Sequence, residues 1–105
     1  MAKKVKPRIP KSVRVAGLEW TVRFEPLLCA REQVYGKTSM HSQEIILDPT
    51  MSPEAIMSTF LHELIHVVNF QFGVTKILDD VKEEMVTNAI ANGLYAAFKD
   101  NDIQF

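Results

Sequence analysis

The stretch Ser-Pro-Glu-Ala-Ile-Met-Ser-Thr-Phe-Leu-His-Glu-Leu-Ile-His-Val-Val-Asn-Phe-Gln-Phe-Gly, residues 52–73, decides the fold of this 105-residue chain. Its first residues are typical of a helix start. Ser52 can cap the first turn, Pro53 suits the first helical position, and Glu54 lies at the positive end of the helix dipole. Large apolar residues then recur at helical spacing, and the final glycine is a typical stop signal. The sequence therefore predicts a helix over residues 53–72.

A second amphipathic helix is predicted downstream, beginning near Asp80. The segment Asp80-Val81-Lys82-Glu83 has the form of a capping box, in which Asp80 accepts a hydrogen bond from a first-turn amide and Glu83 reaches back to the start. We expect an apolar stripe at helical spacing after this start to face the core. The stripe consists of Val86, Ile90, Leu94 and Ala97.

The N-terminal half of the chain predicts strands. Between residues 13 and 24, apolar and polar residues alternate on both sides of Ala16-Gly17, which indicates a β-hairpin. Residues 43–48 are apolar and β-branched at their centre and precede a proline, so they form another predicted strand. Residues 27–34 fit either a short helix or a strand, and Tyr35-Gly36-Lys37 has the composition of a turn. Helices and a small sheet together predict an α+β fold.

Length and composition limit the chain to one small folded domain. Its residues are 47% hydrophobic and 24% charged, which is ordinary for a globular protein and excludes wholesale disorder. The single cysteine, Cys29, excludes an internal disulfide and a cysteine-built zinc cage within one chain. No apolar run is long enough to span a membrane, and no signal-like apolar region follows the N-terminal lysines. We therefore expect a cytoplasmic protein with no membrane partner.

Charge is distributed unevenly along the chain. Six of the 12 lysines and arginines fall in the first fourteen positions, which contain no acidic residue. Residues 15–105 carry the other 6 basic residues against 13 acidic ones, a net charge of −7. We expect residues 1–11 to form a flexible basic arm and residues 12–105 to form a single domain. The acidic body and the lack of a reading motif argue against nucleic acid as the main partner.

The predicted helix at 53–72 contains His62-Glu63-Leu64-Ile65-His66, an H-E-x-x-H pattern. Residues four apart project from one helix face about 6 Å apart, so the two imidazoles can hold one metal ion. Zinc suits this pair, because it accepts neutral imidazole nitrogen and leaves a coordination position to water. Glu63 projects toward the same cleft, where it can take a proton from that water. The pattern predicts a zinc site at His62 and His66 with Glu63 as the catalytic base.

This motif resembles that of the zincin metallopeptidases, and specifically the gluzincin group, in which a glutamate on a following helix completes the metal site. Glu84-Met85-Val86-Thr87-Asn88 is similar to the gluzincin Glu-x-x-x-Asp/Asn pattern. Residues 35–101, roughly two thirds of the chain, resemble the very small phage or prokaryotic proteins called minigluzincins. The resemblance implies a minimal zincin-like fold, with the sheet packed on both helices. It also implies a zinc metalloendopeptidase that acts on peptide or protein substrates.

The third metal ligand can be narrowed to a few side chains. No histidine follows His66, which excludes the metzincin continuation and leaves an acidic ligand unless His41 closes the site from upstream. We favour Glu84, because the capping box gives Asp80 and Glu83 another role. Glu83 stays open as an alternative, because it aligns with the apolar stripe and would point toward the core. The downstream acids weighed are Asp79, Asp80, Glu83 and Glu84.

The resemblance also implies features of substrate binding. In zincins, the strand before the active-site helix forms the rim of the cleft and pairs with an extended peptide; here that strand is residues 43–48. A tyrosine or histidine stabilises the oxyanion, for which Tyr35 and His41 are candidates. Two alternatives remain. One is a latent or non-catalytic zinc-binding protein that binds a partner, with residues 100–105 lying across the cleft; the other is a protease recruited to nucleic acid by the basic arm.

Overall fold

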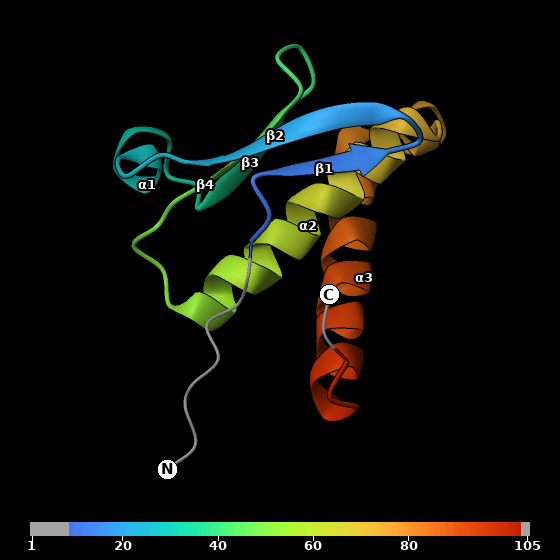
Figure 1. Cartoon of the computed structure of the whole chain (residues 1–105). Coiled ribbons are helices and arrows are strands. Elements are labelled where there is room, and N and C mark those ends of the chain that lie inside the picture. The colour runs from blue at the N-terminus through green and yellow to red at the C-terminus, as the bar shows by residue number, and fades with distance from the viewer. Residues whose placement is uncertain (1–8, 104–105) are drawn as a thin grey trace.

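The structure, a computed structural model, describes residues 9–103 and contains a four-stranded sheet with helices, as the α+β prediction requires (Figure 1). None of the helices between residues 9 and 103 is long and apolar enough to cross a membrane. In chain order the elements are β1 (Ser12–Val15), β2 (Leu18–Phe24), α1 (Leu28–Glu32), β3 (Gly36–Ser39), β4 (Glu44–Leu47), α2 (Pro53–Gln71), the 3₁₀ helix η1 (Val74–Lys76) and α3 (Asp80–Asp100).

The sheet has the strand order β1-β2-β4-β3. The predicted hairpin is confirmed: β1 and β2 are antiparallel, and Ala16 (φ 48°) and Gly17 (φ 84°) both take the left-handed conformation that a tight two-residue hairpin turn requires. From β2 the chain passes through α1 and β3 into β4, which runs parallel to β2 and antiparallel to β3. The sheet is therefore mixed, with β1 and β3 at its two edges.

The strand predicted at residues 43–48 is β4, but it lies inside the sheet. It has β2 on one side and β3 on the other, and Ile45, Ile46 and Leu47 are all buried. A continuous apolar run is typical of a strand that is covered on both faces. The prediction that this strand forms the rim of a cleft is therefore wrong. The edge is β3, which begins in the segment that was predicted as a turn, Tyr35-Gly36-Lys37.

Helix α2 packs against one face of the sheet and agrees with its prediction. Ser52 caps it by accepting a hydrogen bond from the Ala55 amide at 3.2 Å. Its apolar face meets the sheet in the hydrophobic core, which includes Trp20, Ile45, Leu47, Phe60 and Val67. Because the core fixes α2 to the sheet, it also fixes the direction in which the H-E-x-x-H side chains project.

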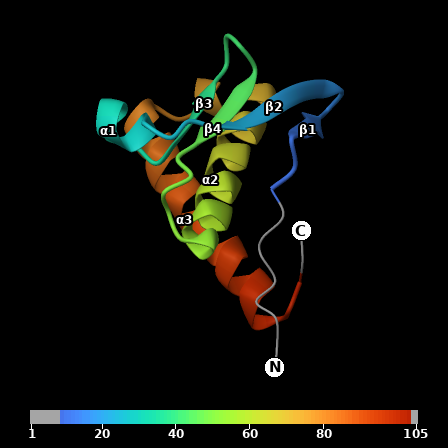
Figure 2. The ribbon, with the colours of Figure 1, turned by 60° about the vertical axis from the view of Figure 1, so that its left-hand side comes forward.

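Helix α3 crosses α2, and its C-terminal half extends away from the sheet in both views (Figures 1 and 2). It begins at Asp80, as predicted, but the capping residue is Asp79, whose carboxylate accepts a hydrogen bond from the Lys82 amide at 2.9 Å. The predicted capping box of Asp80 and Glu83 is therefore wrong, because the neighbouring aspartate takes the cap. This leaves the Glu83 side chain without a capping role.

The predicted core-facing stripe of α3 is also wrong. The side chains that α3 buries are Glu83, Thr87 and Ala91, two of them polar. The apolar residues Val86 and Ile90 are instead 40% and 45% exposed. An amphipathic pattern shows that a helix has an apolar face, but the chain around it decides which face is covered. Here α3 meets α2 through a face that is centred on Thr87.

The structure describes only residues 9–11 of the predicted arm and residues 100–103 of the predicted tail; residues 104–105 lie outside the described residues. Residues 1–8 of the predicted arm lie outside the described residues. Ile9 packs against the core and the Lys11 carbonyl accepts a hydrogen bond from the Val22 amide, so this end of the arm lies on the fold. At the other end, the Ile103 amide donates to the Phe98 carbonyl and turns the chain back on α3. Residues 100–103 therefore stay at the C-terminal end of α3 and do not cover the start of that helix.

Candidate metal centre

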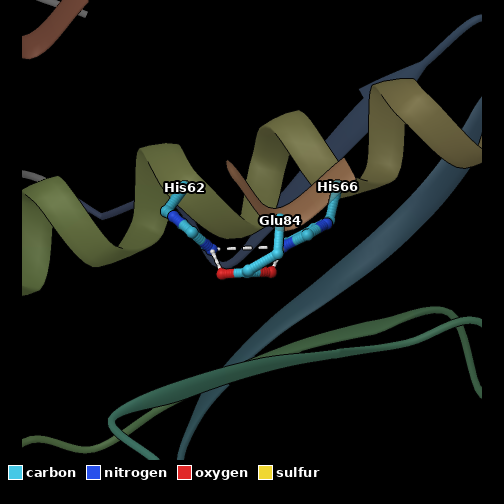
Figure 3. A group of neighbouring side chains, drawn as sticks. All are labelled: His62, His66 and Glu84. Carbon is cyan, nitrogen blue, oxygen red and sulfur yellow. Dashed lines mark hydrogen bonds and ion pairs between the residues drawn. The ribbon is translucent and has the colours of Figure 1, made fainter. Parts of the chain in front are cut away.

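His62, His66 and Glu84 bring two nitrogens and two oxygens to one point between α2 and α3 (Figure 3). The Nε2 atoms of the two histidines lie 3.1 Å apart. Glu84 Oε1 lies 2.9 Å from His62 Nε2, and Glu84 Oε2 lies 3.0 Å from His66 Nε2. The structure thus brings together the three side chains that the sequence predicts as metal ligands, although 18 residues separate His66 from Glu84.

The donor set and its spacing fit a zinc ion. Ligands at the usual zinc distances in a tetrahedral site are about 3.3–3.4 Å apart, so shifts of a few tenths of an ångström adapt these three side chains to the metal. Two imidazoles and one carboxylate leave a fourth position open, as in catalytic zinc sites. Glu84 is 51% exposed, so the point where the donors converge is reachable from solvent.

Glu83 supports the site from behind instead of joining the donor set. Its Oε2 lies 2.7 Å from His66 Nδ1, the ring nitrogen that faces away from Glu84. An ionised carboxylate only accepts, so Nδ1 carries a hydrogen, and in the neutral ring Nε2 presents its lone pair to the convergence point. A cation between this lone pair and the Glu84 oxygen, either a metal ion or a proton on Nε2, removes the repulsion between them. The contact with Glu83 therefore orients His66 in the way that a metal ligand requires.

A buried polar network holds Glu83 in place. Asn69 Nδ2 donates to Glu83 Oε2 at 3.3 Å and lies 2.9 Å from Thr87 Oγ1. Glu83, Asn69 and Thr87 are all buried. Buried polar groups have to be paired, so this network both satisfies α3 and sets its position on α2. Sequence reasoning weighed Glu83 only as a ligand or a cap and missed this supporting role.

Glu63 lies beside the donors and points toward β3. The Thr38 hydroxyl donates to Glu63 Oε1 at 2.9 Å, and the glutamate is only 6% exposed. Burial raises the pKa of Glu63 above its ordinary value; the hydrogen bond from Thr38 and the nearby histidines oppose this rise, and Glu84 adds to it. A carboxylate with a raised pKa is a better proton acceptor, which suits a general base.

The backbone of β3 passes very close to α2 at Gly36. A Cβ at this position would lie 2.5 Å from the Thr59 methyl group and 3.2 Å from Glu63 Cγ. Only glycine permits this approach, which places the β3 edge next to Glu63. The sequence carries only a weak signal for this strand, because Thr38 is the one β-branched residue of β3 and Gly36 has the composition of a turn.

A cavity of 360 Å³ opens over the donor cluster. One wall is the start of β3 with Tyr35 and Gly36, and the opposite wall is α3 with Asn88 and Asn92 one turn apart. The floor is formed by α2, including Thr59, His62 and Glu63. The space therefore runs between the edge strand β3 and the side-chain amides of Asn88 and Asn92.

Of the other residues that the sequence suggested for the site, one lines the cavity and three do not. Tyr35 lines the cavity and is 51% exposed; the neighbouring Cys29 thiol is the main cause that raises the pKa of its hydroxyl. His41 is exposed in the turn between β3 and β4, and is not among the described residues that line the cavity. Asp79 caps α3, and neither it nor Asp80 joins the donor cluster formed by the described residues.

Comparisons of the chain with protein-family models, with curated proteins and with solved structures found no match. The resemblance to gluzincins therefore stays a prediction that rests on the motif residues. The site itself is defined by the convergence of His62, His66 and Glu84, with Glu63 lining the same cavity.

Proposed function

We propose that this protein is a zinc-dependent metallopeptidase of minimal, zincin-like build. The observation that supports it most is the convergence of His62, His66 and Glu84 on one point, with Glu63 buried beside them and a cavity above. Zinc, when bound there, supplies Lewis acidity and lowers the pKa of water to about 7. The following steps are assigned to the side chains of the chain itself.

Glu63 acts as the proton carrier of the reaction. Its carboxylate accepts a proton from the attacking water and delivers it to the leaving amine. Burial favours this role, because it raises the pKa of Glu63, and the Thr38 hydrogen bond keeps one carboxylate oxygen fixed. Glu83 positions His66 through Nδ1, which keeps the other ring nitrogen available for the metal.

The substrate is a peptide in extended conformation. The free edge of β3 offers backbone amides and carbonyls beside Glu63, and strand addition to a sheet edge binds peptides of many sequences. This role replaces the one that was predicted for residues 43–48. Asn88 and Asn92 face the same cavity from α3, where their amides can bond the other side of the peptide.

The test compares Glu63→Gln with Glu54→Gln, two identical changes on α2. With zinc bound, we expect Glu63→Gln to lower cleavage of a fluorescent peptide library by a factor of about 10²–10⁴, with unchanged zinc content. Glu54 is exposed in the first turn, so Glu54→Gln should cleave like wild type. A wild-type zinc protein that cleaves no library member contradicts the proposal, as does a Glu63→Gln variant with full activity.

The second candidate is a non-catalytic zinc protein that binds a partner. The specific observation in its favour is the exposed apolar surface on α3, including Val86 and Ile90, which a partner can cover. The described residues give no support to inhibition by the tail, because residues 100–103 lie at the far end of α3. Stoichiometric zinc without cleavage in the preceding experiment would favour this candidate over the peptidase.

A further inference from the structure

One side of α3 is exposed and carries small and apolar residues between two charged ends. We call it the outer face, defined by Lys82, Val86, Ala89, Gly93, Ala97 and Asp100, all of which are exposed. Ile90 lies beside it and is 45% exposed. In Figure 1, α3 forms one border of the molecule, and none of the helices and strands between residues 9 and 103 covers it on the side away from α2. The middle of the outer face is therefore apolar and open to solvent, which is compatible with an interface.

Gly93 lies in the middle of the outer face, and nothing among residues 9–103 requires a glycine there. A Cβ built on it meets no atom within 4 Å, and its φ is not positive, so neither crowding nor backbone conformation requires glycine. Glycine inside a helix is destabilising relative to alanine. The close approach of another helix would explain the glycine. Gly93, with Ala89 and Ala97 one turn away on either side, lets two helix backbones pack tightly.

The charges at the two ends of the outer face oppose the dipole of their own helix. Lys82 lies in the first turn of α3, where an acidic residue is favoured, and Asp100 lies in the last turn, where a basic one is favoured. Both side chains project within about 20° of the direction of Gly93. Lys82 Nζ lies 3.8 Å from the Asp79 carboxylate, and both side chains are exposed, so this ion pair contributes little.

We propose that the outer face of α3 binds the same face of a second copy of this chain, in an antiparallel arrangement with two-fold symmetry. The opposite charges at its ends decide the orientation: Lys82 meets Asp100 of the partner subunit, and the symmetric pair forms at the other end. A parallel arrangement would place lysine against lysine. The dyad lies near Ala91, midway along a seam about 27 Å long, with the small residues at its centre.

This dimer is independent of the candidate metal centre. Gly93 follows Glu84 by nine residues, so the two project from opposite sides of α3. The cavity therefore stays open when the outer face is covered. The proposal neither requires nor predicts peptidase activity, and its test reads only molecular mass.

The first test measures the mass in solution of the full chain by sedimentation velocity over a range of concentrations. We expect twice the chain mass of 11.9 kDa at high concentration. Gly93→Glu introduces a charge into the centre of the seam and should give a monomer with unchanged helix content by circular dichroism. Asn92→Glu is the matched control. Asn92 directly precedes Gly93, and its side chain projects about 100° away from the direction of Gly93, so this variant should stay dimeric.

The second test reverses the charges at the ends. Lys82→Asp and Asp100→Lys each suit the dipole of α3, so folding of the monomer is not weakened, but each places like charges across the seam. We expect each variant to raise the dimer dissociation constant about tenfold and the double variant to restore it. A wild-type monomer at all concentrations overturns the proposal. So does a dimer that Gly93→Glu leaves intact, or a double variant no tighter than the single ones.

Discussion

The two long helices are both amphipathic in sequence, but they are held in different ways. Helix α2 buries apolar side chains such as Phe60 and Val67 against the sheet. Helix α3 buries Glu83 and Thr87 against α2 and leaves much of its apolar surface exposed. The hydrophobic core thus fixes the two histidines, whereas a polar network fixes the helix that brings Glu84 to them. The donor cluster joins a rigid element to one whose position depends on polar contacts.

The largest expected effect is on the free energy of unfolding, and it should differ between core residues of α2 and apolar residues of α3. Phe60→Ala removes a side chain that is 3% exposed and should lower the free energy of unfolding by about 3–5 kcal/mol. Ile90→Ala on α3 should cost about 1 kcal/mol or less, because the side chain is half exposed. Urea denaturation followed by circular dichroism measures both. Equal losses would contradict the comparison.

Zinc should stabilise α3 more than α2. At a hundredfold excess over its dissociation constant, zinc adds about 2.7 kcal/mol to the free energy of unfolding. Since the metal joins Glu84 to α2, amide hydrogen exchange should slow most in the first half of α3 and least in the sheet-covered part of α2. Chelation should reverse the change. Uniform protection of both helices would show that α3 is already as firmly held as α2.

Glu83→Gln tests whether the polar network acts on the metal site. The variant keeps the size of the side chain but weakens the acceptor for His66 Nδ1, so zinc affinity should fall by about 10–100-fold. Asp80→Asn, an equal loss of charge in the same first turn, should change the affinity far less. Competition with a chromophoric chelator measures both. An unchanged affinity in Glu83→Gln would remove its supporting role.

The elements governed by local rules could be predicted from the sequence. The cap at Ser52, the period of α2 and the Ala16-Gly17 turn depend on neighbouring residues only, and all are confirmed. The run that forms β4 was recognised as a strand, but its interior place in the sheet was not inferred from its continuous apolar character. A local sequence pattern identifies a strand, but it does not show which strands lie beside it in the sheet.

The features that depend on contacts between distant residues could not be predicted. Asp79 and Asp80 are both good caps, and the choice between them decides whether Glu83 is free to reach His66. Likewise, a glycine in a polar segment suggests a turn, whereas Gly36 is required by Thr59 on another element. His62, Glu63 and His66 lie together because they share one helix, and Glu84 reaches them from the following helix.

Gly36→Ala tests how closely β3 packs against α2. The new methyl group would overlap the Thr59 side chain, so we expect a loss of about 1–3 kcal/mol in the free energy of unfolding. Thr59→Ser removes the methyl group at 2.5 Å and should recover much of the loss in the double variant. Urea denaturation of the single and double variants measures this. No rescue would show that the close approach of β3 is not what limits this position.

The smallest effect concerns the loop that leads into α2. Buried Asp48 accepts hydrogen bonds from the Thr50 hydroxyl and from the Cys29 and Thr50 amides, which hold its pKa below the ordinary value. Its ionised form therefore stabilises the fold above about pH 3.9, and this contribution is lost as pH falls through the lowered pKa. Asp48→Asn should have a lower urea midpoint at neutral pH, and the difference should shrink below about pH 4. A difference that is constant with pH would contradict this assignment.

The most direct test of the account is the zinc content of the purified protein after dialysis, measured by elemental analysis for wild type and for His62→Ala. Two imidazoles and the carboxylate of Glu84 should retain about one zinc ion per wild-type chain, and the loss of one imidazole should remove nearly all of it. Wild-type protein that holds no zinc, or a His62→Ala variant that holds as much as wild type, would contradict the metal site and the peptidase with it.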